Sequence, residues 1–339
     1  MNNFNKKIYS LDLLRGIAGY GVAITHYQFF VKDKIEFEFF SYIFVEIFFI
    51  LSGFVLFKQL LKVYKEKNNL KVFYLRRWYR TIPLYLVALI FFTVISNSYN
   101  FDFFKYIFFI QKIIPELLDK DYFMVAWSLS IEELFYFFFP LYLILFKNFD
   151  LNRISILFIL FFIFLKLSFM ENVSPNFLRT GSLLRIDAIA VGFLLALHYK
   201  KIIIYKISIN IIFVLSALFL FNFNFFSFEE NFKTLIFIFS AEIFSVFTLL
   251  FFINFNSSFK NKYLIKLSEL LASQTYSVYL FHLIIMHIFL IMNFSLVNNI
   301  YIYLIVLFLI SSIIYKYFEL PILKNRPRYE INKEFPIKK

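Results

Sequence analysis

An arginine and a histidine lie within one long apolar stretch near the start of the chain. The stretch LDLLRGIAGYGVAITHYQFF covers residues 11–30, which is long enough to cross a membrane, and contains Arg15 and His26. A helix places these two residues about 20° apart around its axis and ~16 Å apart along it. Ionisable groups in a bilayer are costly and usually serve a function. The pair therefore predicts a polar track, unless Arg15 only extends its charged end to the cytoplasmic surface.

A second candidate cluster lies in the stretch DYFMVAWSLSIEELFY, residues 121–136. Ser128 or Ser130 is suited to cap a helix there, and acidic residues in its first turns favour the helix dipole. Glu132 and Glu133 are adjacent, so they point in different directions. One of them is left available as a catalytic acid or base, and the spacing does not choose between them.

Three arginines, Arg76, Arg77 and Arg80, crowd the start of another apolar stretch. Arg77 and Arg80 are three residues apart, so they share a helix face. The positive-inside rule of membrane topology explains the cluster. A clamp for phosphate groups explains it equally well, because the forked guanidinium matches phosphate oxygens.

Other polar residues interrupt apolar stretches further along the chain. Ser52 and Gly53 form a small-residue patch against which another helix or a ligand can pack. Arg185 and Asp187 lie close together, and we expect them to pair with each other or with a glutamate. For Glu319, near the end of the last apolar stretch, we expect a helix cap or an ion pair.

The sequence offers little for a metal site. His282 and His287 are five residues apart rather than four, and no third ligand is evident, so we expect no bound metal. The chain has no cysteine, which excludes disulfides and thiolate ligands. Nucleotide-binding glycine loops and the HExxH and GxSxG motifs are also missing.

The composition is that of a polytopic membrane protein. Of the 339 residues, 61% are hydrophobic, which is more apolar surface than a soluble domain of this size hides. The net charge is +13, but the basic residues flank apolar stretches, where anionic lipid attracts them. We therefore expect membrane lipid, and not nucleic acid, as the partner of this charge.

Hydrophobic length predicts an all-α bundle of ten membrane spans. The predicted spans are 8–30, 39–61, 78–96, 128–147, 153–170, 181–198, 205–222, 232–255, 275–293 and 299–318. With the N-terminus in the cytoplasm, the inner loops carry far more lysine and arginine than the outer loops, so we expect both termini to be cytoplasmic. Segment 101–114 is too short and too charged to span, and an interfacial or re-entrant segment is expected.

An ordered set of motifs covers most of the chain. R-x10-H, FFxLSGF, RRxxRxxP and WSLSxEExFYxxFP are followed by LLRIDAIAVGFLLA, YSVYLFH and YFELP. In these motifs, residues 8–323 resemble the acyltransferase-3 family of bacterial membrane acyltransferases. The resemblance implies a membrane domain over 1–323, without an added extracytoplasmic domain, and a basic cytoplasmic tail over 324–339. Leu134 departs from the pattern, since members often have glutamine there.

The resemblance implies an O-acetyltransferase of the bacterial cytoplasmic (inner) membrane. Such an enzyme would move an acyl group, commonly acetyl, from cytoplasmic acyl-CoA to a hydroxyl of a cell-surface carbohydrate or lipid-linked glycan. The implied catalytic residues are His26 as general base, Glu132, Glu133 and Arg15. The residues implied to bind the CoA donor are Arg76, Arg77, Arg80, Ser52 and Gly53. Those implied to bind the acceptor are Trp127, Ser128, Arg185 and Asp187. We also expect the glycines between Arg15 and His26 to leave room for the thioester arm.

A transporter or flippase is the alternative. In that case Arg15, His26, Glu46 and Arg185 would line a substrate or proton path. Transporters commonly contain internal repeats and broken helix pairs, and neither is clear in this sequence.

Overall fold

All regular secondary structure in the described part of the chain is helical. The computed structural model describes residues 7–34, 36–118, 121–222, 230–256, 259–292 and 299–329. Its elements are α1 (Tyr9–Lys32), α2 (Glu36–Lys65), α3 (Asn69–Ile95), α4 (Asp102–Ile107), α5 (Ala126–Leu145), α6 (Leu151–Phe169), η2 (Met170–Asn172), α7 (Pro175–Thr180), α8 (Ile186–Ile202), α9 (Lys206–Asn222), α10 (Asn231–Phe255), α11 (Lys262–Ile291), α12 (Ile300–Ile314), the π-helical turn η5 (Tyr315–Glu319) and α13 (Leu320–Lys324).

Seven of the described helices are long and apolar enough to cross a membrane. They are α2, α3, α5, α6, α10, α11 and α12, the last continuing to Lys324. This confirms an all-α fold of the multi-pass membrane class. The other three predicted spans fall on α1, α8 and α9. Helix α1 is less apolar because it carries Arg15, three glycines and His26, while α8 and α9 are 17 residues each. The count of ten and the cytoplasmic termini stay predictions.

Segment 101–114 forms only the six-residue helix α4 and a loop. Six residues rise about 9 Å, far less than a bilayer, so this segment does not cross it. The segment packs onto the bundle, because Tyr106 is buried and its carbonyl accepts a hydrogen bond from Tyr85 on α3 at 2.9 Å. The π-helical turn η5 is tied to α11, since Ser277 donates to Glu319 at 2.5 Å.

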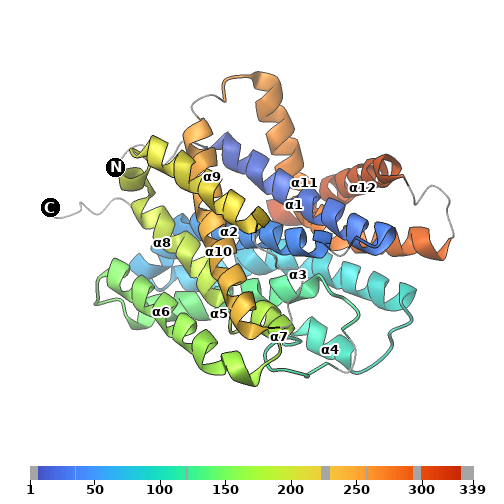
Figure 1. Ribbon diagram of the computed structural model, residues 1–339, viewed down its shortest axis with the longest axis horizontal. Helices are drawn as coiled ribbons and strands as arrows, with labels where there is room; N and C mark the ends of the chain where they lie inside the picture. The colour runs from blue at the N-terminus through green and yellow to red at the C-terminus, as the bar shows by residue number, and fades with distance from the viewer. Residues whose placement is uncertain are drawn as a thin grey trace.

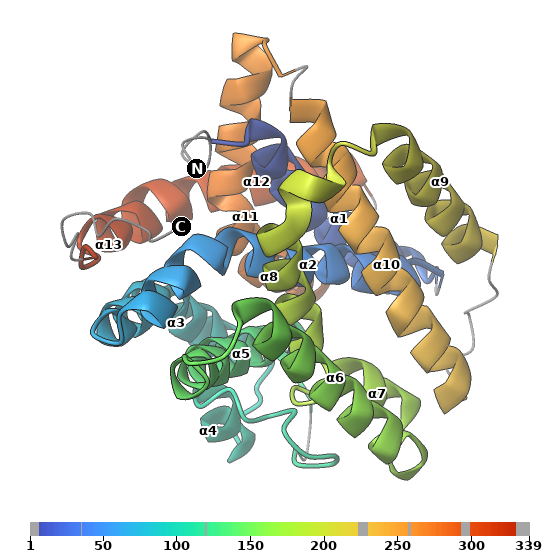
Figure 2. The same ribbon diagram turned by 90° about the vertical axis from the view of Figure 1, so that its left-hand side faces the viewer.

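Helix α2 lies inside the bundle and contacts helices on every side. Its neighbours are α1, α3, α5, α8 and α10. Figure 1 shows α2 crossing the middle of the molecule, and in Figure 2 α1 and α11 lie on one side of it and α5 and α6 on the other. Helix α9 lies at the edge, beside α10. Residues of α2 can therefore border cavities on both of its sides.

Two glycines allow α2 and α8 to cross at close distance. A Cβ atom on Gly53 would overlap the carbonyl oxygen of Ile189, and one on Gly192 would overlap that of Ile50. Backbone approach of this kind is what small residues allow in membrane bundles, where no hydrophobic effect drives helices together. Of the two origins considered for the Ser52-Gly53 patch, helix packing accounts for Gly53.

The glycines of α1 also serve helix packing. A Cβ on Gly16 would lie 2.6 Å from Leu271, and one on Gly19 would lie 2.7 Å from Thr275, both on α11. The predicted tight packing of the first helix is confirmed. The expectation that these glycines leave room for a thioester arm is wrong, because side chains of α11 fill that space.

Adding a methyl group at the α2–α8 crossing tests this packing. Because the methyl would meet backbone oxygen atoms that cannot rotate away, we expect Gly53→Ala and Gly192→Ala each to destabilise the protein by roughly 1–3 kcal/mol. Thermal unfolding in detergent, followed by size-exclusion chromatography, measures the loss. Ile90→Ala is the control, since Ile90 is 51% exposed on the outside of α3. Equal stability of all three variants would contradict the close crossing.

Candidate functional site

A cavity of about 220 Å³ lies between α1, α2, α3, α5 and α11, and we call it the arginine cavity. The charged residues that line it are Arg15, Arg76, Arg77, Arg80, Arg326 and Glu132. Five guanidinium groups therefore face one carboxylate. A cavity with this excess of positive charge, lined by forked donors, is suited to a ligand that carries several phosphate oxygens.

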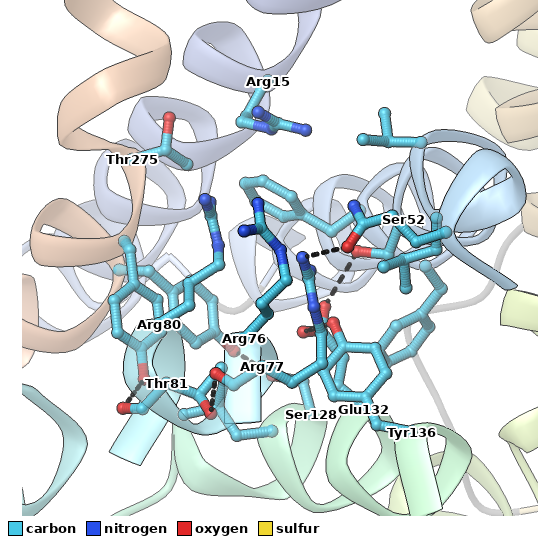
Figure 3. Close-up of a pocket in the computed structure, with 18 of the residues that line it drawn as sticks. Arg15, Ser52, Arg76, Arg77, Arg80, Thr81, Ser128, Glu132, Tyr136 and Thr275 are labelled. Atoms are coloured by element: carbon cyan, nitrogen blue, oxygen red, sulfur yellow. Dashed lines mark hydrogen bonds between the residues drawn. The ribbon is translucent and has the colours of Figure 1, made fainter. Parts of the chain in front are cut away.

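Other parts of the protein hold some of these arginines in place. Arg77 donates to the side-chain oxygen of Gln59 at 2.8 Å, and Arg76 donates to the carbonyl of Pro327 at 2.6 Å. For Arg15 and Arg80, the described residues provide neither a hydrogen bond nor an ion pair. Figure 3 shows the arginines of α3 pointing toward the space below Arg15. The guanidiniums of Arg15 and Arg80 are therefore available to a ligand.

Arg326 comes to this cavity from beyond the last helix. Its Nε donates to the carbonyl of Leu323 at 2.9 Å. Burial, together with the neighbouring charges of Arg76, Arg80 and Arg77, lowers the pKa of Arg326 to about 10. The predicted cytoplasmic tail 324–339 thus contributes Arg326 to the site, while residues 330–339 lie outside the described residues.

The structure separates the two adjacent glutamates. Glu132 borders the arginine cavity and accepts hydrogen bonds from Ser52 at 3.1 Å and from Tyr136 at 2.7 Å. Glu133 is not among the residues that line this cavity. Ser128 and Glu132 are four residues apart, so they share the side of α5 that faces the cavity, whereas Glu133 lies on another face of the helix.

A second cavity of about 140 Å³ contains His26, and we call it the histidine cavity. Nδ1 of His26 lies 2.8 Å from Nε2 of His282 on α11. Trp127 and Tyr42 line the cavity with their rings 5.6 Å apart. Its charged groups form ion pairs, Arg179 with Glu38 at 3.6 Å and Lys112 with Asp121 at 2.6 Å. Aromatic faces beside paired charges and amide groups resemble a surface for a polar, uncharged ligand.

The two cavities meet at Val45 and Tyr279, which line both of them. The hydroxyl of Tyr279 lies 2.5 Å from that of Ser128 and donates to the carbonyl of Val125 at 3.1 Å. Trp127 and Ser128 are consecutive on α5, so they face different ways, Trp127 into the histidine cavity and Ser128 into the arginine cavity. This short segment and Tyr279 form the wall between the cavities.

Arg185 and Asp187 belong to a separate buried cluster, the ionic network. Arg185 pairs with Glu46, and Lys166 binds Asp187 at 2.8 Å. Glu242 lies 3.6 Å from both Lys166 and Arg185. The expected pairing of Arg185 with a glutamate is confirmed. None of these five residues lines the arginine or histidine cavity.

The predicted site residues therefore fall into three groups. Those that border the arginine cavity are Arg15, Ser52, Arg76, Arg77, Arg80, Ser128 and Glu132. His26 and Trp127 border the histidine cavity. Those that border neither are Gly53, Glu133, Arg185 and Asp187. The catalytic and binding roles assigned to all of them stay predictions.

Sequence reasoning missed Arg326, Tyr279, Lys166 and Glu242. Lys166 and Glu242 carried a usable signal, because each is a charged residue inside a predicted span. Arg326 carries only the signal of a topogenic charge. Tyr279 and His282 both lie in the motif YSVYLFH, but neither is assigned a role in the reaction from the sequence, and His282 is weighed there only as a metal ligand. Within the described residues, no group of three or more histidine and acidic side chains is placed to hold a metal.

Comparison with known proteins gives one family. The model of the family described as an acyltransferase domain matches residues 8–316. A Haemophilus influenzae protein whose name assigns no activity is 33% identical over 214 residues, which cover 52% of this chain and 85% of that protein. A Staphylococcus aureus protein named "Putative O-acetyltransferase" is 33% identical over 152 residues, 40% of this chain but 24% of that longer protein. No solved structure matches the chain significantly.

Removing one charge from the ionic network tests whether it stabilises the fold. Lys166→Met leaves three buried carboxylates against one arginine, so we expect a loss of roughly 3–5 kcal/mol in unfolding free energy. Adding Asp187→Asn should restore much of it. Lys233→Met is the control, since its ion pair with Glu230 is exposed. If Lys166→Met and Lys233→Met lower the melting temperature equally, the network is not a source of stability.

Proposed function

The chain belongs to the acyltransferase-3 family and is a membrane acyltransferase, and from this premise we propose the reaction that it catalyses. It moves an acetyl group from cytoplasmic acyl-CoA to a hydroxyl of a cell-surface carbohydrate or lipid-linked glycan. The protein lies in the bacterial cytoplasmic membrane with ten spans and both termini inside. The observation that carries this proposal is the pair of cavities, one rich in arginine and one containing His26, that share the wall at Tyr279.

The arginine cavity suits the donor. Acyl-CoA carries a diphosphate and a 3′-phosphate, and charge-assisted bonds from guanidinium to phosphate are among the strongest in proteins. Arg80 and Arg326 bind these phosphates, with Arg76 and Arg77 held beside them by their own hydrogen bonds. The basic residues near this cavity belong to the flanks that the positive-inside rule assigns to the cytoplasm, which is where acyl-CoA is found.

The histidine cavity suits the acceptor. Sugars bind to aromatic faces and to hydrogen-bonding groups, and Trp127, Tyr42 and Asn176 supply both kinds of surface. Among the described residues that line this cavity, His26 is the only imidazole, and the two carboxylates, Glu38 and Asp121, are held in ion pairs. It is therefore the general base for the acceptor hydroxyl.

The positions of the four residues that a transport path would need also bear on the transporter alternative. A transport path would bring Arg15, His26, Glu46 and Arg185 together along one channel. They belong instead to the arginine cavity, the histidine cavity and, for the last two, the ionic network. This distribution favours two substrate sites over one continuous path.

Replacing the proposed base tests the chemistry. We expect His26→Gln to lower kcat at least about a hundredfold, because a positioned general base contributes 10²–10⁴. The assay follows radiolabelled acetyl from acetyl-CoA into the glycan and lipid fractions of membranes that contain the chain. His198→Gln is the matched control, since His198 lies outside both cavities and contacts Asn152. Full incorporation of label by His26→Gln would refute the assignment of His26 as the general base. No incorporation by the wild type would refute acetyl-CoA as the donor.

Replacing the proposed phosphate ligands tests the donor site. We expect Arg80→Gln and Arg326→Gln each to raise the KM for acetyl-CoA roughly ten- to hundredfold with little change in kcat, since each removes a charge-assisted bond worth about 1.5–3 kcal/mol. Arg153→Gln, an exposed arginine on α6, is the control. If only the amount of protein inserted in the membrane falls while the KM for acetyl-CoA stays constant, these arginines set the orientation of the helices and do not bind the donor.

A further inference from the structure

A second histidine holds the ring of His26. His282 lies on α11 and is fully buried. The two rings lie edge to edge with their centroids 5.0 Å apart and an angle of 21° between their planes, and Nδ1 of His26 meets Nε2 of His282 at 2.8 Å. In a neutral pair, one of these two nitrogens must carry the hydrogen and the other must be bare.

Backbone carbonyls beside His282 determine which of the two nitrogens carries the hydrogen. Nδ1 of His282 lies 2.7 Å from the carbonyl oxygen of Tyr279 and 3.3 Å from that of Val278. A carbonyl oxygen only accepts hydrogen bonds, so Nδ1 of His282 must be the protonated nitrogen. Its Nε2 is then bare and accepts from His26, whose Nδ1 must donate. Nε2 of His26 is therefore left bare, on a side chain that lines the histidine cavity.

We propose that His282 is a positioning residue that fixes His26 in the tautomer whose Nε2 acts as the base. This inference rests on the proposed acyl transfer and deepens it. The hydrogen bonds run in series from the Tyr279 carbonyl to His282, then to His26, and then to the acceptor hydroxyl. The role resembles that of the residue that orients the histidine in a catalytic triad, here performed by a neutral ring.

The tautomer makes the proton balance of the transfer explicit. Nε2 of His26 takes the hydroxyl proton as the acceptor oxygen bonds to the acyl carbon. The carbon–sulfur bond of the thioester then breaks, and His26 returns the same proton to the leaving sulfur, giving an ester and a free thiol. His26 keeps its Nδ1 hydrogen throughout. His282 passes no proton on, because its own hydrogen is directed at a carbonyl that cannot take it.

The test compares variants that keep or remove the acceptor at the Nε2 position of His282. His282→Gln keeps an acceptor oxygen near this place, whereas His282→Phe fills the space without one. We expect His282→Phe to lower kcat about a hundredfold with little change in either KM, while His282→Gln keeps most of the activity. His287→Phe, five residues along the same helix and beside Phe92, is the matched control.

Nitrogen-15 NMR of the labelled protein in nanodiscs measures the tautomer of His26 independently of the activity assay. In the wild type we expect His26 to have a protonated Nδ1 and a bare Nε2, and in His282→Phe a shift toward the opposite tautomer. A protonated Nε2 in the wild type, or full kcat in a folded His282→Phe, would overturn the inference. If His282→Phe does not fold, the wild-type spectrum and the activity of His282→Gln still decide. A wild type that shows the expected tautomer but no transfer would refute the proposed function alone.

Discussion

Charge buried within a membrane must be compensated. The two charged clusters of this bundle differ in how far the protein itself compensates their charge. In the ionic network, three carboxylates face an arginine and a lysine at ion-pair distance, so the charge is nearly balanced within the protein. Among the described residues that line the arginine cavity, five guanidiniums face the single carboxylate of Glu132. An uncompensated buried charge costs several kcal/mol. The first cluster is therefore suited to a structural role, whereas the second is suited to the anionic donor that we propose.

Tyr279 connects the parts of the site through two different groups. Its side chain stands between the cavities, hydrogen-bonded to Ser128, at the place where the proposed thioester donor and hydroxyl acceptor would meet. Its carbonyl accepts the hydrogen of His282 and so sets the tautomer of His26. Both positions depend on one turn of α11, which α1 approaches closely because of Gly16 and Gly19. Close helix packing, more than any single polar contact, positions His26, the base that we propose.

Hydrophobic length and residue spacing along one helix were enough to predict much of this molecule. Each of the ten predicted spans overlaps a long helix, and Arg77 and Arg80 line one cavity, as their spacing on α3 indicates. What the sequence did not reveal depends on contacts between helices. His282 was read with His287 on its own helix, although its partner lies 256 residues away on α1. Arg326 entered the arginine cavity from a segment whose composition indicated only a cytoplasmic tail.

A neutral ring is a suitable partner for a base in this environment. A carboxylate in the place of His282 would add a further buried charge at a cost of several kcal/mol, which a neutral imidazole avoids. The disadvantage is weaker stabilisation of the imidazolium that forms when His26 takes the hydroxyl proton. That cation need not persist, however. An ordinary thiol titrates near 8.5 and imidazole near 6.5, so return of the proton to the leaving sulfur is downhill by about two pKa units. The leaving group itself thus supplies the driving force that a buried carboxylate provides elsewhere.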